Sequence, residues 1–377
     1  MTVARASRST SETRIFLDVH PAHPPRPADR LRPAPEHDEA PSVFGLTPGE
    51  FEQLGYGGSV CSLFANLHRP WAWARSEAPL LGKQWQSALR GHSLRPMSIH
   101  SESTSSDGST RLVLRAQDER RIEAVWMPRD LKNQRVTLCV SSQIGCGMGC
   151  TFCATGAMGI GRNLTAGEIV AQVHALLLRF PGYRGHQLNV VFMGMGEPLH
   201  NVEHVLKAIE ILCHPWGLGM HSNRITVSTS GLVKGIDRLA SAAPRPLLAL
   251  SLNATTDEQR SQIMPVNRTY PIRDLKAALM RWPAAHRERI TLEYVLRQGE
   301  NDTRQDAQRL AQFAQGIPHL MSLIPLNEHS FTKSRRPSDE EVQDFADMLY
   351  ACGVRPHIRW SRGLDIGAAC GQLAPRP

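Results

Sequence analysis

The sequence of 377 residues predicts an α/β fold with a largely parallel sheet, preceded by a smaller α+β accessory domain and a disordered tail. Three observations lead to this prediction. Apolar strand segments alternate with amphipathic helices over residues 136–377. A helical pattern followed by short strands fills residues 43–135. Residues 1–42 hold seven of the 26 prolines and show no sustained apolar period, which is typical of disorder.

Composition limits the class of protein. Hydrophobic residues make up 41% and charged residues 21%, which is ordinary globular usage and excludes collagen-like or coiled-coil rods. Because no apolar run reaches the length of a membrane span and no secretory signal is visible, we expect a cytoplasmic protein without a membrane segment. Eight cysteines in such a chain indicate thiol chemistry or metal binding. The net charge of +8 suits a polyanionic partner but is equally common without one.

The accessory domain is expected to begin with helices and end with strands. The segment Leu46-Thr47-Pro48-Gly49-Glu50 has the pattern of a capped helix start, and apolar residues then recur at helical spacing from Cys61 to Leu89. Short strands are predicted at residues 97–100, 110–116 and 122–127, with a Ser- and Gly-rich turn at 101–109.

The third part repeats a strand, a loop and a helix. Such alternation predicts a parallel sheet, either open or closed into a full or partial barrel. Two helices begin with capping boxes, Thr165 with Glu168 and Ser338 with Glu341. The strands are predicted at residues 136–142, 188–193, 225–228, 247–252, 290–296, 320–325 and 355–360. The helices are predicted at residues 165–180, 202–213, 233–241, 256–264, 273–282, 302–315 and 338–352.

Three cysteines lie in the loop after the first of these strands, at Cys146, Cys150 and Cys153. A structural zinc site would need a fourth ligand, and His174 or a distant cysteine could serve. Three thiolates suffice for a 4Fe-4S cluster whose fourth iron is left to a non-protein ligand. That iron can chelate the amino and carboxylate groups of S-adenosylmethionine (SAM). The motif therefore favours a radical SAM cluster over zinc and over accidental thiols.

Polar and glycine-rich segments follow four other predicted strands. In a parallel barrel the carboxyl ends of the strands lie on one face, where active sites form. Each segment alone is as easily a turn, but together with the cysteine loop they indicate one site. Their glycines let the backbone approach a ligand, and a carboxylate can receive an ammonium group. The segments are Gly194-Met195-Gly196-Glu197-Pro198, Ser228-Thr229-Ser230-Gly231, Ser251-Leu252-Asn253 and Asn327.

Two further segments complete a pattern, Arg162-Asn163-Leu164-Thr165-Ala166-Gly167-Glu168 and Arg362-Gly363-Leu364-Asp365-Ile366-Gly367-Ala368-Ala369-Cys370-Gly371-Gln372-Leu373. With the cysteine loop, they resemble the RlmN/Cfr family of radical SAM RNA methyltransferases from about Val43 onward. The resemblance implies a partial (β/α)6 barrel and an accessory domain that selects RNA. It implies methylation of an adenine ring carbon, C2 in preference to C8, in 23S ribosomal RNA, with transfer RNA a further substrate in some members. It also implies a 4Fe-4S cluster, SAM, an electron donor such as a flavodoxin or ferredoxin, and a monomer.

The resemblance assigns roles to three residues outside the cluster loop. Cys370 matches the cysteine that one SAM methylates, and a radical formed from a second SAM lets that methyl carbon add to the base. Cys139 matches the cysteine that resolves the resulting protein–RNA crosslink by forming a disulfide with Cys370. Glu123 matches the acceptor of the adenine ring proton.

The same resemblance assigns the SAM contacts to Gly196, Glu197, Ser228, Ser251, Leu252, Asn253 and Asn327. Without the family resemblance, the residues are also compatible with two other functional classes of protein. A radical SAM enzyme that modifies a protein or small molecule would share the barrel motifs, and a metal-stabilised RNA-binding protein would share the basic charge. For an RNA substrate, the candidate phosphate contacts are Lys333, Arg335, Arg336 and Arg162.

Overall fold

The computed structural model describes residues 41–54, 58–70, 85, 87, 89–94, 97–130, 135–184, 187–284 and 288–374. The tail predicted over residues 1–42 lies outside this set except for its last two residues, and so does most of the stretch between the first helices and Leu89. Within the described ranges, no helix combines the length and the apolar character that crossing a bilayer requires.

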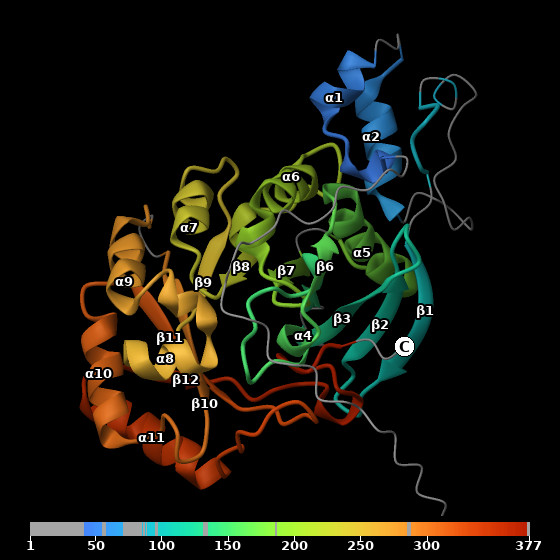
Figure 1. The fold of residues 1–377 in the computed structure, drawn as a ribbon. Helices are drawn as coiled ribbons and strands as arrows, with labels where there is room; N and C mark the ends of the chain where they lie inside the picture. Colours follow the sequence, from blue (N-terminus) through green and yellow to red (C-terminus); the bar gives the residue numbers. More distant parts are fainter. Residues whose placement is uncertain are drawn as a thin grey trace, which may run out of the picture.

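One ten-stranded sheet organises the described chain (Figure 1). In spatial order its strands are β1 (Ser98–Thr104), β2 (Thr110–Arg115), β3 (Arg121–Asp130), β4 (Arg135–Cys139), β7 (Leu188–Phe192), β8 (Ile225–Thr229), β9 (Leu247–Ser251), β10 (Ile290–Leu296), β11 (His319–Pro325) and β12 (Pro356–Ile358). Pairing is antiparallel from β1 to β4 and parallel from β4 to β12. Because β1 and β12 are the two edges, the sheet curves without closing, and the predicted α/β fold with a partial barrel is confirmed.

A helix follows each parallel strand up to β11. These helices are α5 (Ala166–Arg179), α6 (Val202–Cys213), α7 (Val233–Ala240), α8 (Asp257–Ile263) with α9 (Ile272–Arg281), α10 (Arg304–Ala314) and α11 (Asp339–Ala351). Both predicted capping boxes are present. Glu168 N donates to the Thr165 hydroxyl at 3.2 Å while Thr165 N donates to the Glu168 carboxylate at 2.9 Å, and Ser338 pairs with Glu341 in the same way.

The accessory domain contributes helices as well as strands β1 to β3. Its helical elements are η1 (Val43–Gly45), α1 (Pro48–Gln53) and α2 (Val60–His68). Thr47 caps α1, which confirms the predicted capped start, and Glu50 completes a capping box with it. Phe44 and Phe64 are fully buried, and η1 packs on α5. Since β3 also pairs with β4, one sheet runs through both parts of the chain.

Short elements in the cysteine loop were not expected. They are β5 (Gln143–Gly145), α4 (Ala154–Ala157) and β6 (Ile160–Asn163). Gly145 has a φ of 73°, and a Cβ there would lie 2.0 Å from the Gly159 carbonyl oxygen, so only glycine permits this approach. Short 3-10 turns complete the fold at η4 (Pro198–Asn201), η5 (Ser222–Arg224), η6 (Pro265–Arg268) and η7 (Leu364–Ile366).

The segment after β12 crosses to the β1–β2 hairpin and then returns to the cysteine loop (Figure 1, red). On the hairpin, Asp107 accepts hydrogen bonds from Arg362 at 3.4 Å and from the Gly363 backbone at 3.0 Å. At the cysteine loop, Ala154 N donates to the Gly371 carbonyl at 2.7 Å. The C-terminal tail is therefore fixed at both ends of its path.

Candidate active site

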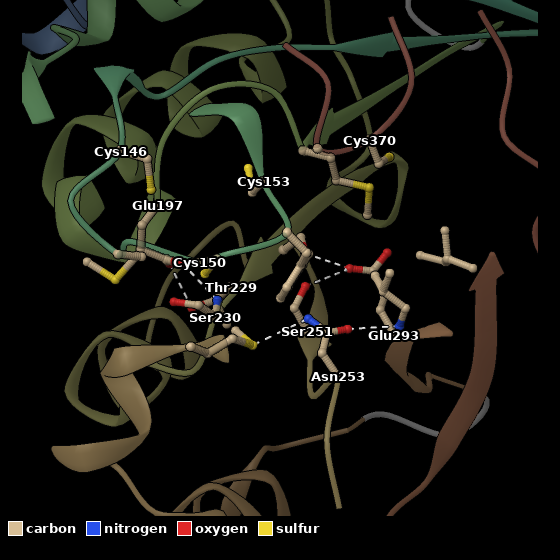
Figure 2. A pocket seen from close by; sticks show the side chains of 18 of the residues that line it. Cys146, Cys150, Cys153, Glu197, Thr229, Ser230, Ser251, Asn253, Glu293 and Cys370 are labelled. Atoms are coloured by element: carbon tan, nitrogen blue, oxygen red, sulfur yellow. Dashed lines mark hydrogen bonds between the residues drawn. The ribbon is translucent and has the colours of Figure 1, made fainter. Parts of the chain in front are cut away.

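A cavity of about 170 Å³ opens at the carboxyl ends of the parallel strands (Figure 2). It is lined by cysteines from the loop, by side chains at the ends of five strands (β7 to β11) and by one cysteine of the C-terminal tail. The predicted residues in its lining are Cys146, Cys150, Cys153, Gly196, Glu197, Ser228, Ser251, Asn253, Asn327 and Cys370. Leu252 does not line this cavity; its side chain is buried and its backbone amide pairs with Glu293 on β10.

The three loop cysteines are free thiols whose charged forms are strongly disfavoured. Burial raises the pKa of Cys146 and Cys150, and repulsion from the neighbouring thiols adds to the effect. Three thiolates here therefore need a cationic partner. Among the described residues, no three Cys, His, Asp or Glu side chains converge as one metal ion requires, and His174 packs on Phe44 instead. The donors thus suit a multinuclear cluster better than zinc.

Glu197 is held rigidly at the cavity wall. It is 3% exposed, and its carboxylate accepts hydrogen bonds from the Thr229 hydroxyl and the Ser230 backbone, each at 2.7 Å. Burial raises its pKa while these hydrogen bonds oppose the shift. A buried carboxylate facing a cavity is a ready partner for an ammonium group such as that of SAM.

Gly196 lets the backbone beside Glu197 pack on β5, because a Cβ there would lie 2.6 Å from the Gln143 side chain. A further observation fits a bound cofactor. Asn327 donates to the Cys370 carbonyl at 3.0 Å, but its buried Oδ1 has no partner among the described residues. Such an acceptor at a cavity wall is available to a donor from a ligand or from a water. The residues present therefore fit a 4Fe-4S cluster with SAM beside it.

Asn253 adopts a left-handed conformation, with a φ of 61°. Asparagine tolerates this region better than most residues. Its side-chain oxygen accepts from the Val295 backbone at 2.9 Å, and its nitrogen contacts the Met264 sulfur at 3.4 Å. The residue thus joins β9 to β10 at the cavity floor.

Glu293 and Arg359, which sequence reasoning missed, link the cofactor side of the site to Cys370. The hydroxyls of Ser228 and Ser251 donate to one carboxylate oxygen of Glu293, at 2.7 and 3.2 Å. Arg359 donates to the other oxygen at 3.0 Å and to the Cys370 sulfur at 3.4 Å. Glu293 could have been predicted from the sequence, because it is an acidic residue inside the otherwise apolar strand 290–296.

Cys370 lies between the cofactor cavity and a second cavity of about 50 Å³. Both cavities are lined by Cys370 and Met193, and the second is also lined by Cys139. Cys139 is buried, and burial together with the nearby Cys370 raises its pKa to about 12. Both cysteines are free thiols in this structure.

Glu123 lines neither cavity and lies buried on β3. Burial raises its pKa to about 7, although Arg111, at 3.3 Å, and the Ala374 backbone in the C-terminal tail oppose the shift. A carboxyl group with a pKa near neutrality can exchange protons at physiological pH.

One candidate phosphate contact is wrong. Arg162 is 3% exposed, and its guanidinium forms paired hydrogen bonds with Glu168, both at 2.7 Å, and with Asp118, at 2.9 and 3.0 Å. It braces the cysteine loop against α5 and cannot reach a phosphate. Arg336 is partly exposed and pairs with Asp339 at 2.8 Å.

Comparison with known proteins identifies relatives along the chain. Residues 140–314 match the family model described as the Radical SAM superfamily. A protein of Syntrophotalea carbinolica named "Dual-specificity RNA methyltransferase RlmN" is 46% identical over 71% of this chain and 70% of its own length. One of the same name from Geobacter sulfurreducens is 41% identical over 88% of this chain and 91% of its own. The crystal structure of a radical SAM methyltransferase from Sphaerobacter thermophilus superimposes on this structure with a TM-score of 0.79. The two sequences are 40% identical, and the match covers 88% of this chain and 99% of the other.

Proposed function

Because the chain belongs to the RlmN family of radical SAM RNA methyltransferases, we propose that it methylates an adenine ring carbon of 23S ribosomal RNA through Cys370. The proposed carbon is C2 rather than C8, and transfer RNA is proposed as a second substrate. The observation that carries the proposal is the position of Cys370 between the cofactor cavity and the cavity of Cys139.

The cofactors of the family, a 4Fe-4S cluster and SAM, supply a methyl group and the one-electron chemistry that activates an unreactive carbon. The ring carbons C2 and C8 of adenine are poor nucleophiles, so a polar transfer from SAM alone is not available to them. In this chain the thiols of Cys146, Cys150 and Cys153 would hold the cluster. Glu197 would receive the ammonium group of SAM, and the orphaned amide oxygen of Asn327 would accept a hydrogen bond from it.

Cys370 first carries the methyl group and then the base in this scheme. Arg359 holds its sulfur at the boundary of the two cavities. Once the methyl carbon is bonded to the adenine carbon, the Cys139 thiol, which its pKa of about 12 keeps neutral until then, gives up its proton as its sulfur attacks the Cys370 sulfur. A disulfide forms, the carbon–sulfur bond breaks, and the released electron pair stays on carbon, which then takes up a proton. The disulfide must be reduced before the next turnover.

Glu123 is proposed to take the adenine ring proton. Its support is a pKa of about 7, caused by burial, which suits a group that must both accept and release a proton. Because it lies beneath the C-terminal tail beside Ala374 rather than at either cavity, the tail must shift for it to reach a base.

The test is mass spectrometry of adenosines in 23S ribosomal RNA from cells that lack the protein and are supplied with variants. Wild-type protein should restore a methyladenosine, which standards identify as C2 or C8. Cys370→Ala should abolish it, while Cys352→Ala, at an exposed free thiol, should not. If Cys370→Ala leaves methylation intact the mechanism is wrong, and if no RNA product forms a protein or small-molecule substrate is favoured.

A further inference from the structure

The second cavity offers the substrate a route to Cys370 that the cofactors leave open. Cys370 forms part of both cavities, and the first is lined by the three cluster cysteines and Glu197. A base that receives carbon from Cys370 needs access to this sulfur that bound cofactors do not fill. The second cavity reaches the same sulfur with Cys139 in its wall, and none of the three cluster cysteines lines it.

Arginines concentrate positive charge around this cavity, which is lined by Arg129, Arg359 and Arg362. Arg359 is paired with Glu293 and Arg362 with Asp107. No described carboxylate forms an ion pair with Arg129, whose pKa is lowered by burial and by repulsion from the other two arginines. Excess guanidinium charge at a cavity mouth is suited to phosphate, which arginine binds in a fork geometry.

An exposed aromatic side chain stands at the same place. Trp360 follows Arg359 in the chain, lines the second cavity and is 48% exposed. The guanidinium of Arg336 lies 5.7 Å from the centroid of its ring. Aromatic rings flanked by arginine are the platforms on which proteins stack unpaired bases.

We infer that RNA reaches Cys370 through the second cavity, where Trp360 stacks on an unpaired base and Arg129 binds a phosphate. The inference rests on the proposed RNA substrate and adds the surface that receives it. An apolar protein segment would use Trp360 but would leave the guanidinium of Arg129 without a partner. RNA satisfies both features together.

The test measures the affinity of the reconstituted full chain for a fluorescent RNA hairpin with adenines in its loop, over a range of salt concentrations. Trp360→Ala should weaken binding about tenfold, and Trp360→Phe should restore most of the affinity because it keeps a stacking face. Arg129→Ala should weaken binding and reduce the slope of log K against log salt by about 0.7 to 0.9. Matched controls are Tyr350→Ala, at a ring that is 69% exposed on α11, and Arg273→Ala, at a side chain that is 88% exposed on α9.

The outcomes separate this inference from the proposed function. Iron–sulfur absorbance and thermal midpoint identify any variant that has merely misfolded, and Trp360→Phe supplies a milder substitution. If wild-type protein binds and methylates RNA while Trp360→Ala and Arg129→Ala bind as tightly, the inference is overturned and the proposed function stands. If the two controls lose as much affinity as the cavity variants, the inference is also overturned. A wild-type protein that binds no RNA and forms no methyladenosine contradicts both.

Discussion

Arg359 donates a hydrogen bond from Nη2 to the sulfur of Cys370 across 3.4 Å. The same guanidinium also donates a hydrogen bond to the carboxylate of Glu293. That carboxylate accepts hydrogen bonds from the hydroxyls of Ser228 and Ser251 on the cofactor side. The interaction with the Cys370 sulfur raises the pKa of Arg359, while burial opposes the shift and the charge of Glu293 adds to it. One ionic network thus joins the groups that face SAM to the sulfur that would receive its methyl group.

Removing this donor should slow methylation of Cys370. Arg359→Ala should reduce the rate at least about tenfold, because a hydrogen bond from a charged guanidinium contributes about 1.5–3 kcal/mol. Arg359→Lys should recover part of the rate, since it keeps the charge but loses the fork. Mass spectrometry of the peptide containing Cys370 after incubation with SAM measures the modified fraction. Equal modification of wild-type and Ala variants would show that Arg359 does not position the sulfur.

The ion pair of Glu293 with Arg359 should also contribute to stability. Glu293→Gln should lower the free energy of unfolding by about 1–3 kcal/mol, because a largely buried guanidinium loses its counter-charge. This figure is below that of a fully buried pair because the Arg359 side chain is 21% exposed. Glu203→Gln breaks the exposed pair with Arg238 and should change stability by less than about 1 kcal/mol. Urea denaturation compares them, and equal losses would contradict the prediction.

The pH dependence of RNA methylation should report on Glu123. Its pKa of about 7 lies above the ordinary value of 4.5 because burial disfavours the charged form. Only the carboxylate can accept a proton, so the rate should rise about tenfold between pH 6 and pH 8 and level off above. Glu123→Gln should remove this rise and leave protein–RNA crosslinks unresolved, which denaturing gels detect. An unchanged pH profile in the Gln variant would exclude Glu123 as the base.

Release of the C-terminal tail should expose Cys370. Hydrogen bonds from Ser109 and Gly363 and the charge of Arg362 overcome the effect of burial and lower the pKa of Asp107 to about 2, so it is charged at neutral pH. Asp107→Asn should weaken these contacts, and iodoacetamide should then alkylate Cys370 several-fold faster. Asp347→Asn, at an exposed position on α11, is the control. Identical alkylation rates in all three proteins would mean that the hairpin does not hold the tail.

Elements with a clear hydrophobic period were predicted within a few residues. Strand 290–296 and helix 202–213 have the predicted bounds, because their apolar residues recur with the period of the element that buries them. Strand β1 runs on to Thr104, through residues predicted as a turn. It is an edge strand with mostly exposed side chains, so its sequence lacks the alternation of apolar and polar residues by which a strand is predicted.

The parts of the site that sequence reasoning missed depend on residues distant in the chain. The role of Arg359 requires Glu293, 66 residues earlier, to lie beside it. Arg162 was predicted to contact phosphate because its pairing with Asp118, 44 residues away in the chain, could not be located from the sequence. The three cluster cysteines could be predicted from their spacing because they fall within one loop of the sequence.

The attachment of the tail to Asp107 also bears on the order in which the parts of the site assemble as the chain folds. Residue 370 is translated after every strand of the sheet, yet its path is fixed by a hairpin that is translated before all the parallel strands. A nascent chain can therefore fold its accessory strands and barrel while the thiol opposite the cluster loop is still missing. The pair of Cys139 and Cys370 is completed after these strands, when the tail docks on them.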